Sequence, residues 1–273
     1  MKLSIVLTAQ QTRFQAATLS GALEENLAKI DALGYQGVEL AIRDPRAVDM
    51  EELAALTVKH HLQVPAIGTG QAWGEEGLSF TDPDPAIRQA AIERIHDHIP
   101  LAARFGAVII IGLIRGVVKP GVERDQAMDW LTEALQHCCQ SAWNEGVRLA
   151  LEPINRYETS LINTVAEGFN LIDAVGMPNF GLLLDTFHMN IEEPRIEESI
   201  RACGSRIFHF HVADSNRRHP GAGHLDFRSI LRALQETGYE GFVSGEFLPW
   251  PDAITAAEKN IAWLTSLNNS RAN

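Results

Sequence analysis

Four residues of the types that bind divalent metal ions each end a short apolar run. They are Glu152, Asp185, His211 and Glu246, and each is separated from the next by about the length of one strand and one helix. Three carboxylates and an imidazole facing one centre would repel one another without a cation. An oxygen-rich set suits Mn²⁺, Mg²⁺ or Co²⁺, and Zn²⁺ also fits. We therefore predict a metal site formed by these four residues.

A single carboxylate after a strand more often caps the next helix or stays solvated in a loop. Four such ends in series are harder to explain in that way. Alternation along the strand that contains His211 places His209 one layer below it on the inner face. The same alternation predicts that Phe208 and Phe210 face the helices.

Three further polar residues follow these strand ends. His188 lies three residues after Asp185, Glu158 follows the fifth strand and Arg217 follows the seventh. A lone histidine or arginine in a loop is often simply solvated or hydrogen-bonded nearby. Their shared position beside the predicted metal makes all three candidates for the same site.

The elements that would position these residues are short apolar runs that alternate with amphipathic stretches. The runs are four to six residues long, as expected of strands buried on both faces. We predict eight strands, at 3–7, 37–40, 63–68, 107–112, 147–152, 181–185, 207–212 and 242–246.

The stretches between the runs have the periodicity of helices. Asp84 and Pro85 predict the start of the third helix, because they supply a cap and a proline in the first turn. Pro100 is expected to kink that helix or end it early. Strands alternating with helices over 273 residues predict a single α/β domain spanning 1–273, a (β/α)8 TIM barrel. A doubly wound open sheet is the alternative, although no Gly-x-Gly-x-x-Gly follows the first strand.

The charge of the chain disfavours nucleic acid as a partner. Its formal net charge is −12, and no basic run occurs that would displace counterions from a duplex. The longest apolar stretch, 107–114, is far shorter than a membrane span, and the N-terminal apolar run is too short for a signal peptide. Three cysteines in a chain of this size fit a reducing compartment. We expect a cytoplasmic protein without membrane partners.

Six segments resemble the xylose-isomerase-like barrel family of sugar isomerases and epimerases, which includes D-tagatose 3-epimerase and hydroxypyruvate isomerase. The resemblance runs from the first strand to the last. The segments are 38–45, 66–72, 110–116, 152–158, 185–193 and 210–217.

The resemblance implies roles for the seven polar residues at the strand ends. Glu152, Asp185, His211 and Glu246 would bind the metal, commonly Mn²⁺. Glu152 and Glu246 would also transfer the protons of an epimerisation through an enediolate. The remaining three would hold substrate oxygens: His188, Arg217 and Glu158. Homo-oligomers are common in the family, so we expect one here.

The substrate implied is a small keto sugar or a keto-uronate of the 5-keto-L-gluconate or D-tagaturonate type. A keto-uronate needs a cation for its carboxylate, and Arg43 and Arg115 follow the second and fourth strands. Residues 69–85 form a long connection expected to act as a lid, with Trp73 covering the sugar. Glu39 is expected to hydrogen-bond a substrate hydroxyl or a rim arginine.

Other activities remain open at this point. An aldose–ketose or hydroxypyruvate isomerase would use the same site, as would an epimerase of neutral ketoses. A non-enzymatic alternative is a metal-containing sugar-binding barrel, although no predicted ligand or proton-transfer group is missing. A metal-dependent endonuclease is opposed by the acidic balance of the chain.

Overall fold

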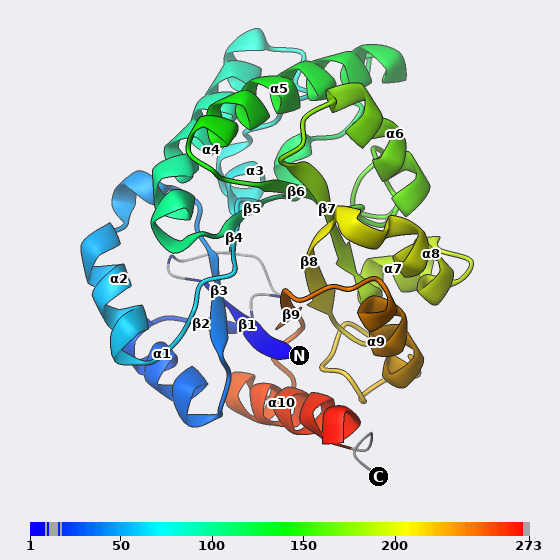
Figure 1. The fold of residues 1–273 in the computed structure, drawn as a ribbon. Helices are drawn as coiled ribbons and strands as arrows, with labels where there is room; N and C mark the ends of the chain where they lie inside the picture. Colours follow the sequence, from blue (N-terminus) through cyan, green and yellow to red (C-terminus); the bar gives the residue numbers. More distant parts are fainter. Residues whose placement is uncertain (9, 11–15, 17, 270–273) are drawn as a thin grey trace.

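The computed structural model describes residues 1–8, 10, 16 and 18–269. Its centre is a ring of parallel strands surrounded by helices (Figure 1). The first strand pairs with the second long strand on one side and with the last strand on the other, so the sheet closes on itself. The predicted single (β/α)8 barrel is therefore confirmed, and the open-sheet alternative is wrong.

All eight predicted strands are present, with bounds that differ by a few residues. A two-residue strand, β2, adds to β1 beyond the closed ring. The strands are β1 (Lys2–Thr8), β2 (Leu19–Ser20), β3 (Gly37–Ala41), β4 (Ala66–Gly68), β5 (Val108–Ile111), β6 (Leu149–Leu151), β7 (Phe180–Asp185), β8 (Ile207–Val212) and β9 (Phe242–Gly245).

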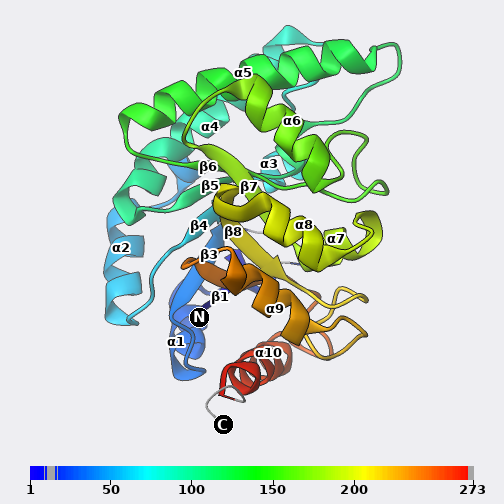
Figure 2. The same cartoon turned by 45° about the vertical axis from the view of Figure 1, so that its right-hand side comes forward.

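The helices cover the outside of the ring, as the turned view also shows (Figure 2). In the described part of the chain they are α1 (Leu23–Ala32), α2 (Met50–Lys59), α3 (Gln71–Glu76), α4 (Pro85–Phe105), α5 (Arg124–Asn144), α6 (Val165–Val175), α7 (Thr186–Glu192), α8 (Ile196–Cys203), α9 (Phe227–Glu236) and α10 (Ala253–Asn269). Short 3-10 turns lie at Pro45–Ala47, Leu113–Arg115 and Gly204–Arg206.

Helix α4 begins where the sequence predicts but does not end early. The side chain of Asp84 accepts a hydrogen bond from the backbone of Ala86, and Pro85 occupies the first turn. The helix continues through Pro100 to Phe105 and stops at Gly106, whose φ of 64° is left-handed. Pro100 lies on the exposed face, so water can bond to the carbonyl that its missing N–H leaves unpaired.

The connection 69–85 is not a structureless loop. Helix α3 occupies its first half, and Gly77 ends that helix with a φ of 72°. The second half is held by the buried Asp82, which forms an ion pair with Lys119. Whether this segment closes as a lid remains a prediction.

Two layers of apolar side chains make the core. The outer layer packs strands against helices. The inner side chains lie in two smaller groups: Ala66, Val108, Ile110, Ala150 and Leu183 form one, and Val6 and Ala41 the other.

Strand β8 departs from the expected alternation. Leu182 pairs with Ile207, but the next residue, Leu183, pairs with His209, so Phe208 is an extra residue in β8. Phe208 packs against the inner layer, whereas Phe210 belongs to the outer one. The prediction that Phe208 faces the helices is therefore wrong, because the bulge turns it inward.

No described helix is long and apolar enough to cross a membrane. The three cysteines, Cys138, Cys139 and Cys203, are buried and unpaired.

Candidate metal centre

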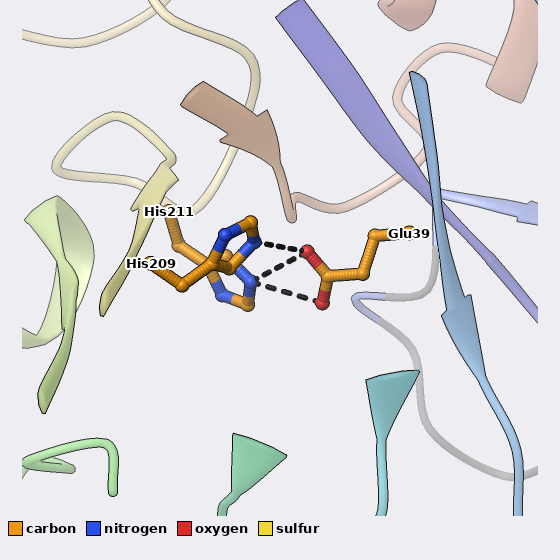
Figure 3. A group of neighbouring side chains, drawn as sticks. All are labelled: Glu39, His209 and His211. Atoms are coloured by element: carbon orange, nitrogen blue, oxygen red, sulfur yellow. Dashed lines mark hydrogen bonds and ion pairs between the residues drawn. The ribbon is translucent and has the colours of Figure 1, made fainter. Parts of the chain in front are cut away.

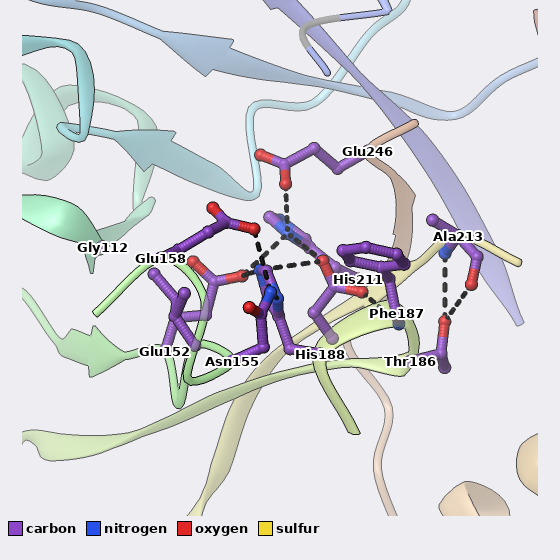
Figure 4. Close-up of polar contacts among 12 residues, drawn as sticks. Gly112, Glu152, Asn155, Glu158, Thr186, Phe187, His188, His211, Ala213 and Glu246 are labelled. Carbon is purple, nitrogen blue, oxygen red and sulfur yellow. Dashed lines mark hydrogen bonds and ion pairs between the residues drawn. The ribbon is translucent and has the colours of Figure 1, made fainter. Parts of the chain in front are cut away.

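The four predicted metal ligands meet at the carboxyl ends of β6 to β9. Nδ1 of His211 lies 3.9 Å from Oε1 of Glu152, 4.0 Å from Oδ2 of Asp185 and 3.8 Å from Oε2 of Glu246. Figure 4 shows Glu152 and Glu246 approaching His211 from different sides. These separations are too long for hydrogen bonds but suit donor atoms that share one ion.

Three of the four donor atoms lack a hydrogen bond. Oε1 of Glu152, Oδ2 of Asp185 and Nδ1 of His211 are buried without a hydrogen bond in the described structure. Buried polar atoms are costly when unpaired, so a bound cation accounts for all three. Three carboxylates and one imidazole are a donor set suited to Mn²⁺, Mg²⁺, Co²⁺ or Zn²⁺. The residues therefore fit a divalent metal.

The electrostatics of the carboxylates lead to the same conclusion. Burial and the nearby charge of Glu246 raise the pKa of Glu152 well above its usual range. Burial, with the charge of Asp185 adding to it, raises the pKa of Glu246 to about 7. Burial also raises the pKa of Asp185. A divalent cation would relieve this clustering of negative charge.

Glu39 lies behind His211 and forms no bond to an arginine among the described residues, whereas the expected contact with a substrate hydroxyl stays a prediction. Its carboxylate accepts hydrogen bonds from Nε2 of His209 at 2.8 Å and from Nε2 of His211 at 2.9 Å (Figure 3). Burial opposes ionisation of Glu39, but the two imidazoles hold its pKa below the usual range. With Nε2–H bonded to Glu39, His211 presents Nδ1 to the other three ligands.

His188 is oriented by a residue that the sequence did not single out. Nδ2 of Asn155 donates to Nδ1 of His188 at 2.8 Å, so Nε2 carries the proton. That nitrogen lies 3.6 Å from Oε1 of Glu152. Burial, followed by the charge of Arg217, lowers the pKa of His188 well below its usual range. His188 is therefore a neutral donor beside the metal ligands.

Arg217 and Glu158 meet at the same cavity. The guanidinium of Arg217 donates to Oε1 of Glu158 at 3.0 Å and lies 3.8 Å from Oε2 of Glu246. Arg217 has a φ of 57°, a left-handed conformation that is uncommon for a residue with a side chain. Asn155 also donates to Glu158, at 2.9 Å, and so links both polar pairs.

These residues line a cavity of about 250 Å³. This volume is below the range of about 300–1,000 Å³ common for drug-sized ligands, so a small molecule fits. Trp73, Gly74 and Glu75 of α3 form part of the wall. The side opposite the polar groups is apolar and includes Val6, Ile110 and Leu113.

The two arginines expected to bind a substrate carboxylate do not line this cavity. Arg115 is fully buried, and its guanidinium donates to the carbonyl oxygens of Gly112, Ile162 and Glu152. The prediction for Arg115 is wrong, because the short 3-10 turn after β5 folds its side chain beneath the backbone of the β6 loop. It supports the main chain at Glu152 instead.

Arg43 also points away from the cavity. Its Nε lies 3.2 Å from Oε1 of Glu76, and its carbonyl accepts a hydrogen bond from Arg94. Its side chain is engaged with the end of α3, which contradicts the expected contact with a substrate carboxylate.

Comparison with known proteins gives consistent matches over nearly the whole chain. The chain is 34% identical to an L-ribulose 3-epimerase of Mesorhizobium japonicum over 85% of its length and 78% of the relative's. A solved structure of L-ribulose 3-epimerase superposes with a TM-score of 0.85 at 27% identity, covering 100% of this chain and 96% of that one.

A D-psicose 3-epimerase of Clostridium cellulolyticum, solved with D-tagatose, superposes with a TM-score of 0.84 at 25% identity. That match covers 98% of this chain and 99% of the other. The profile of the xylose isomerase-like TIM barrel family matches residues 27–267. The chain therefore belongs to the xylose isomerase-like TIM barrel family.

Proposed function

We propose that this protein is a divalent-metal-dependent carbohydrate epimerase that inverts the configuration at C3 of a small neutral ketose. The observation that carries the proposal is the set of three buried, unpaired donor atoms on Glu152, Asp185 and His211, completed by Glu246 at the mouth of one cavity. The names of the relatives support sugar epimerisation as the reaction class.

Glu152, Asp185, His211 and Glu246 would hold the ion, which when bound polarises a carbonyl oxygen and makes the neighbouring C–H more acidic. One of the two glutamates removes the proton from the carbon next to the ketone. The other returns a proton to the opposite face, and their roles exchange for the reverse reaction.

The surrounding residues position the sugar. Nε2–H of His188 donates to a substrate oxygen, and Asn155 holds that imidazole in the required tautomer. Arg217 and Glu158, bonded to each other, offer a donor and an acceptor to neighbouring hydroxyl groups. Trp73 covers the apolar side of the sugar from α3.

The lining favours a neutral ketose over a keto-uronate. Among the described residues, Arg217 is the one lysine or arginine of the cavity wall, and it already pairs with Glu158. Arg43 and Arg115, on which a carboxylate clamp would depend, are engaged elsewhere. A neutral sugar leaves no uncompensated carboxylate in this acidic site.

Deuterium incorporation tests the reaction. The protein with Mn²⁺ is incubated in D2O with L-ribulose, D-fructose, D-tagatose, D-tagaturonate or hydroxypyruvate, and the ion is removed before NMR. We expect deuterium at C3 together with the C3 epimer for a neutral ketose. Preference for D-tagaturonate would overturn the neutral substrate, and exchange at C1 with an aldose product would indicate an isomerase. No exchange with any compound would favour a sugar-binding barrel.

The two-glutamate scheme predicts that Glu152→Gln and Glu246→Gln each abolish turnover, because an amide cannot carry the transferred proton. The expected loss is at least about a thousandfold in kcat. Glu93→Gln, an exposed glutamate on α4, is the matched control and should keep full activity. Substantial epimerisation by either site variant would contradict the scheme.

A further inference from the structure

A second cavity, of about 500 Å³, lies at the opposite end of the barrel from the candidate metal centre. Its walls come from the amino ends of the strands. Lys2 and Phe242 begin β1 and β9, Val108 begins β5 and Arg148 precedes β6. None of the four proposed metal ligands lines it, although His209, which bonds Glu39 behind the metal centre, forms part of its wall.

Three aromatic rings of this cavity, those of Phe242, Phe208 and Tyr239, each rest over a glycine. A Cβ on Gly37 would lie 2.6 Å from the ring of Phe242, and a Cβ on Gly181 would lie 2.7 Å from the ring of Phe208. The ring of Tyr239 is seated in the same way over Gly241, and its hydroxyl donates to the carbonyl of Phe242. These close approaches fix the rings as rigid walls.

Two cations lie over these rings. Nζ of Lys2 is 4.6 Å from the centre of the Phe242 ring, and the guanidinium carbon of Arg148 is 4.9 Å from the centre of the Phe208 ring. Stacking on fixed rings limits the conformations of the two side chains. Arg104 contributes a third positive charge, 3.8 Å from the exposed Glu51.

The cavity has no acidic side chain among its described lining residues, although the whole chain has a net charge of −12. Within the described structure, neither Lys2 nor Arg148 forms a salt bridge. Three positively charged side chains therefore line one cavity, and the only described carboxylate paired with any of them is that of Glu51, beside Arg104. Such a place concentrates anions, and its concave walls strengthen the field.

We propose that this cavity binds a small multivalent anion of the phosphate class, through charge-assisted hydrogen bonds from Arg148. The planar guanidinium of Arg148 can bond two oxygens of one phosphate, and the ammonium of Lys2, which enters the cavity from the other side of the ring, adds to its positive potential. The proposal is independent of the epimerase activity, because the two cavities open at opposite ends of the barrel.

Calorimetric titration of the full-length protein in Mg²⁺ with inorganic phosphate, and separately with sulfate, tests this site. We expect saturable binding of one phosphate per chain. The double variant Lys2→Gln/Arg148→Gln should weaken it at least about tenfold. Arg195→Gln/Arg201→Gln removes the same charge from exposed ion pairs on α8 and its N-terminus, and should change the affinity less than about twofold.

Two further measurements distinguish this cavity from the metal centre and from a folding defect in the double variant. Arg148→Lys keeps the positive charge but loses the paired donors, so it should weaken phosphate binding about threefold to tenfold, and it serves as the test variant if the double variant does not fold. In the second measurement, Mn²⁺ replaces Mg²⁺ and the width of the ³¹P NMR signal of phosphate is recorded. Because paramagnetic broadening falls steeply with distance, phosphate in this cavity should be broadened far less than an anion bound at the metal centre. The proposal is overturned by absence of saturable binding, by equal weakening in both double variants, or by strong Mn²⁺ broadening.

Discussion

Glu39 determines which nitrogen of His211 faces the other three proposed metal ligands. It accepts hydrogen bonds from Nε2 of both His209 and His211, and all three side chains are buried. The carboxylate therefore fixes the imidazole plane and its tautomer. His209 bonds the same carboxylate and approaches it from the same side as His211 (Figure 3).

Glu39→Gln and His209→Asn should each weaken Mn²⁺ binding by about 10- to 100-fold, the range found for residues that orient metal ligands. Calorimetry or the EPR signal of free Mn²⁺ measures this without reference to activity. His224→Asn, a loop histidine that contacts Ser215, is the matched control and should bind Mn²⁺ normally. Unchanged affinity in both Glu39→Gln and His209→Asn would show that His211 needs no such support.

Metal binding should also depend on pH. The pKa of Glu246 is about 7 and that of Glu152 is raised well above its usual range, so below neutral pH a proton occupies groups that the ion requires. Mn²⁺ affinity should therefore fall about tenfold per pH unit for each proton displaced as the pH drops from about 7 to about 5.5. Titrations in buffers of different ionisation enthalpy count the protons released. A flat profile would contradict the raised pKa values.

At the scale of elements, ion pairs attach α3 to the barrel. Arg94 of α4 is nearly buried and donates to Oε2 of Glu76 at 2.8 Å, while Arg43 approaches the other oxygen of the same carboxylate. Trp73 lies one helical turn before Glu76 and forms part of the cavity wall. This connection positions the wall that would cover a bound sugar.

Glu76→Gln should raise KM for the ketose by about threefold to tenfold while kcat changes less than about twofold. The substitution removes the charge that holds α3 to Arg94, and hydrogen bonds to charged groups contribute about 1.5–3 kcal/mol when well buried. Steady-state kinetics measure both constants. Glu93→Gln, on the exposed face of α4, should change neither, and an unaltered KM in Glu76→Gln would show that α3 needs no anchor.

The sequence predicted the strands and the polar residues at their ends better than it predicted the conformation of the connecting segments and the partners of their side chains. Apolar runs and terminal polar residues placed Glu152 and Asp185 correctly because adjacent parallel strands end at one face. Arg115 and Arg43 were misjudged because their partners, backbone carbonyls and the carboxylate of Glu76, depend on tertiary packing. No sequence pattern marked Asn155 as a functional residue beyond its position in the loop after β6. Helix α3 was not predicted because it lies in a glycine-rich stretch whose hydrophobic periodicity is weak.

For the whole molecule, several large aromatic side chains remain on the surface. Tyr157 is 82% exposed, and Trp143, Trp250 and Trp263 are each about half exposed. Tryptophan and tyrosine are enriched where proteins associate. Trp250 stacks on Arg218 and Trp263 lies against Gly221, so part of each ring packs within the barrel and the expected homo-oligomer stays a prediction.

Light scattering during size-exclusion chromatography should give a molar mass at least about twice the 30.1 kDa of one chain at micromolar concentration. Trp250→Ala and Trp143→Ala, which lie on different elements, would then show which face associates. A mass of one chain across the accessible concentrations would contradict the prediction.

The bulge at Phe208 separates the inward–outward alternation of side chains at the start of β8 from the alternation at its end. Ile207 faces the helices and His209 faces the ring, as they would if Phe208 were absent, because the neighbouring Leu182 and Leu183 are consecutive. Insertion or loss of that single residue thus alters the amino end of the barrel without turning His211 away from its partners. Within one strand, one end can diverge between related proteins while the chemistry at the other end is retained.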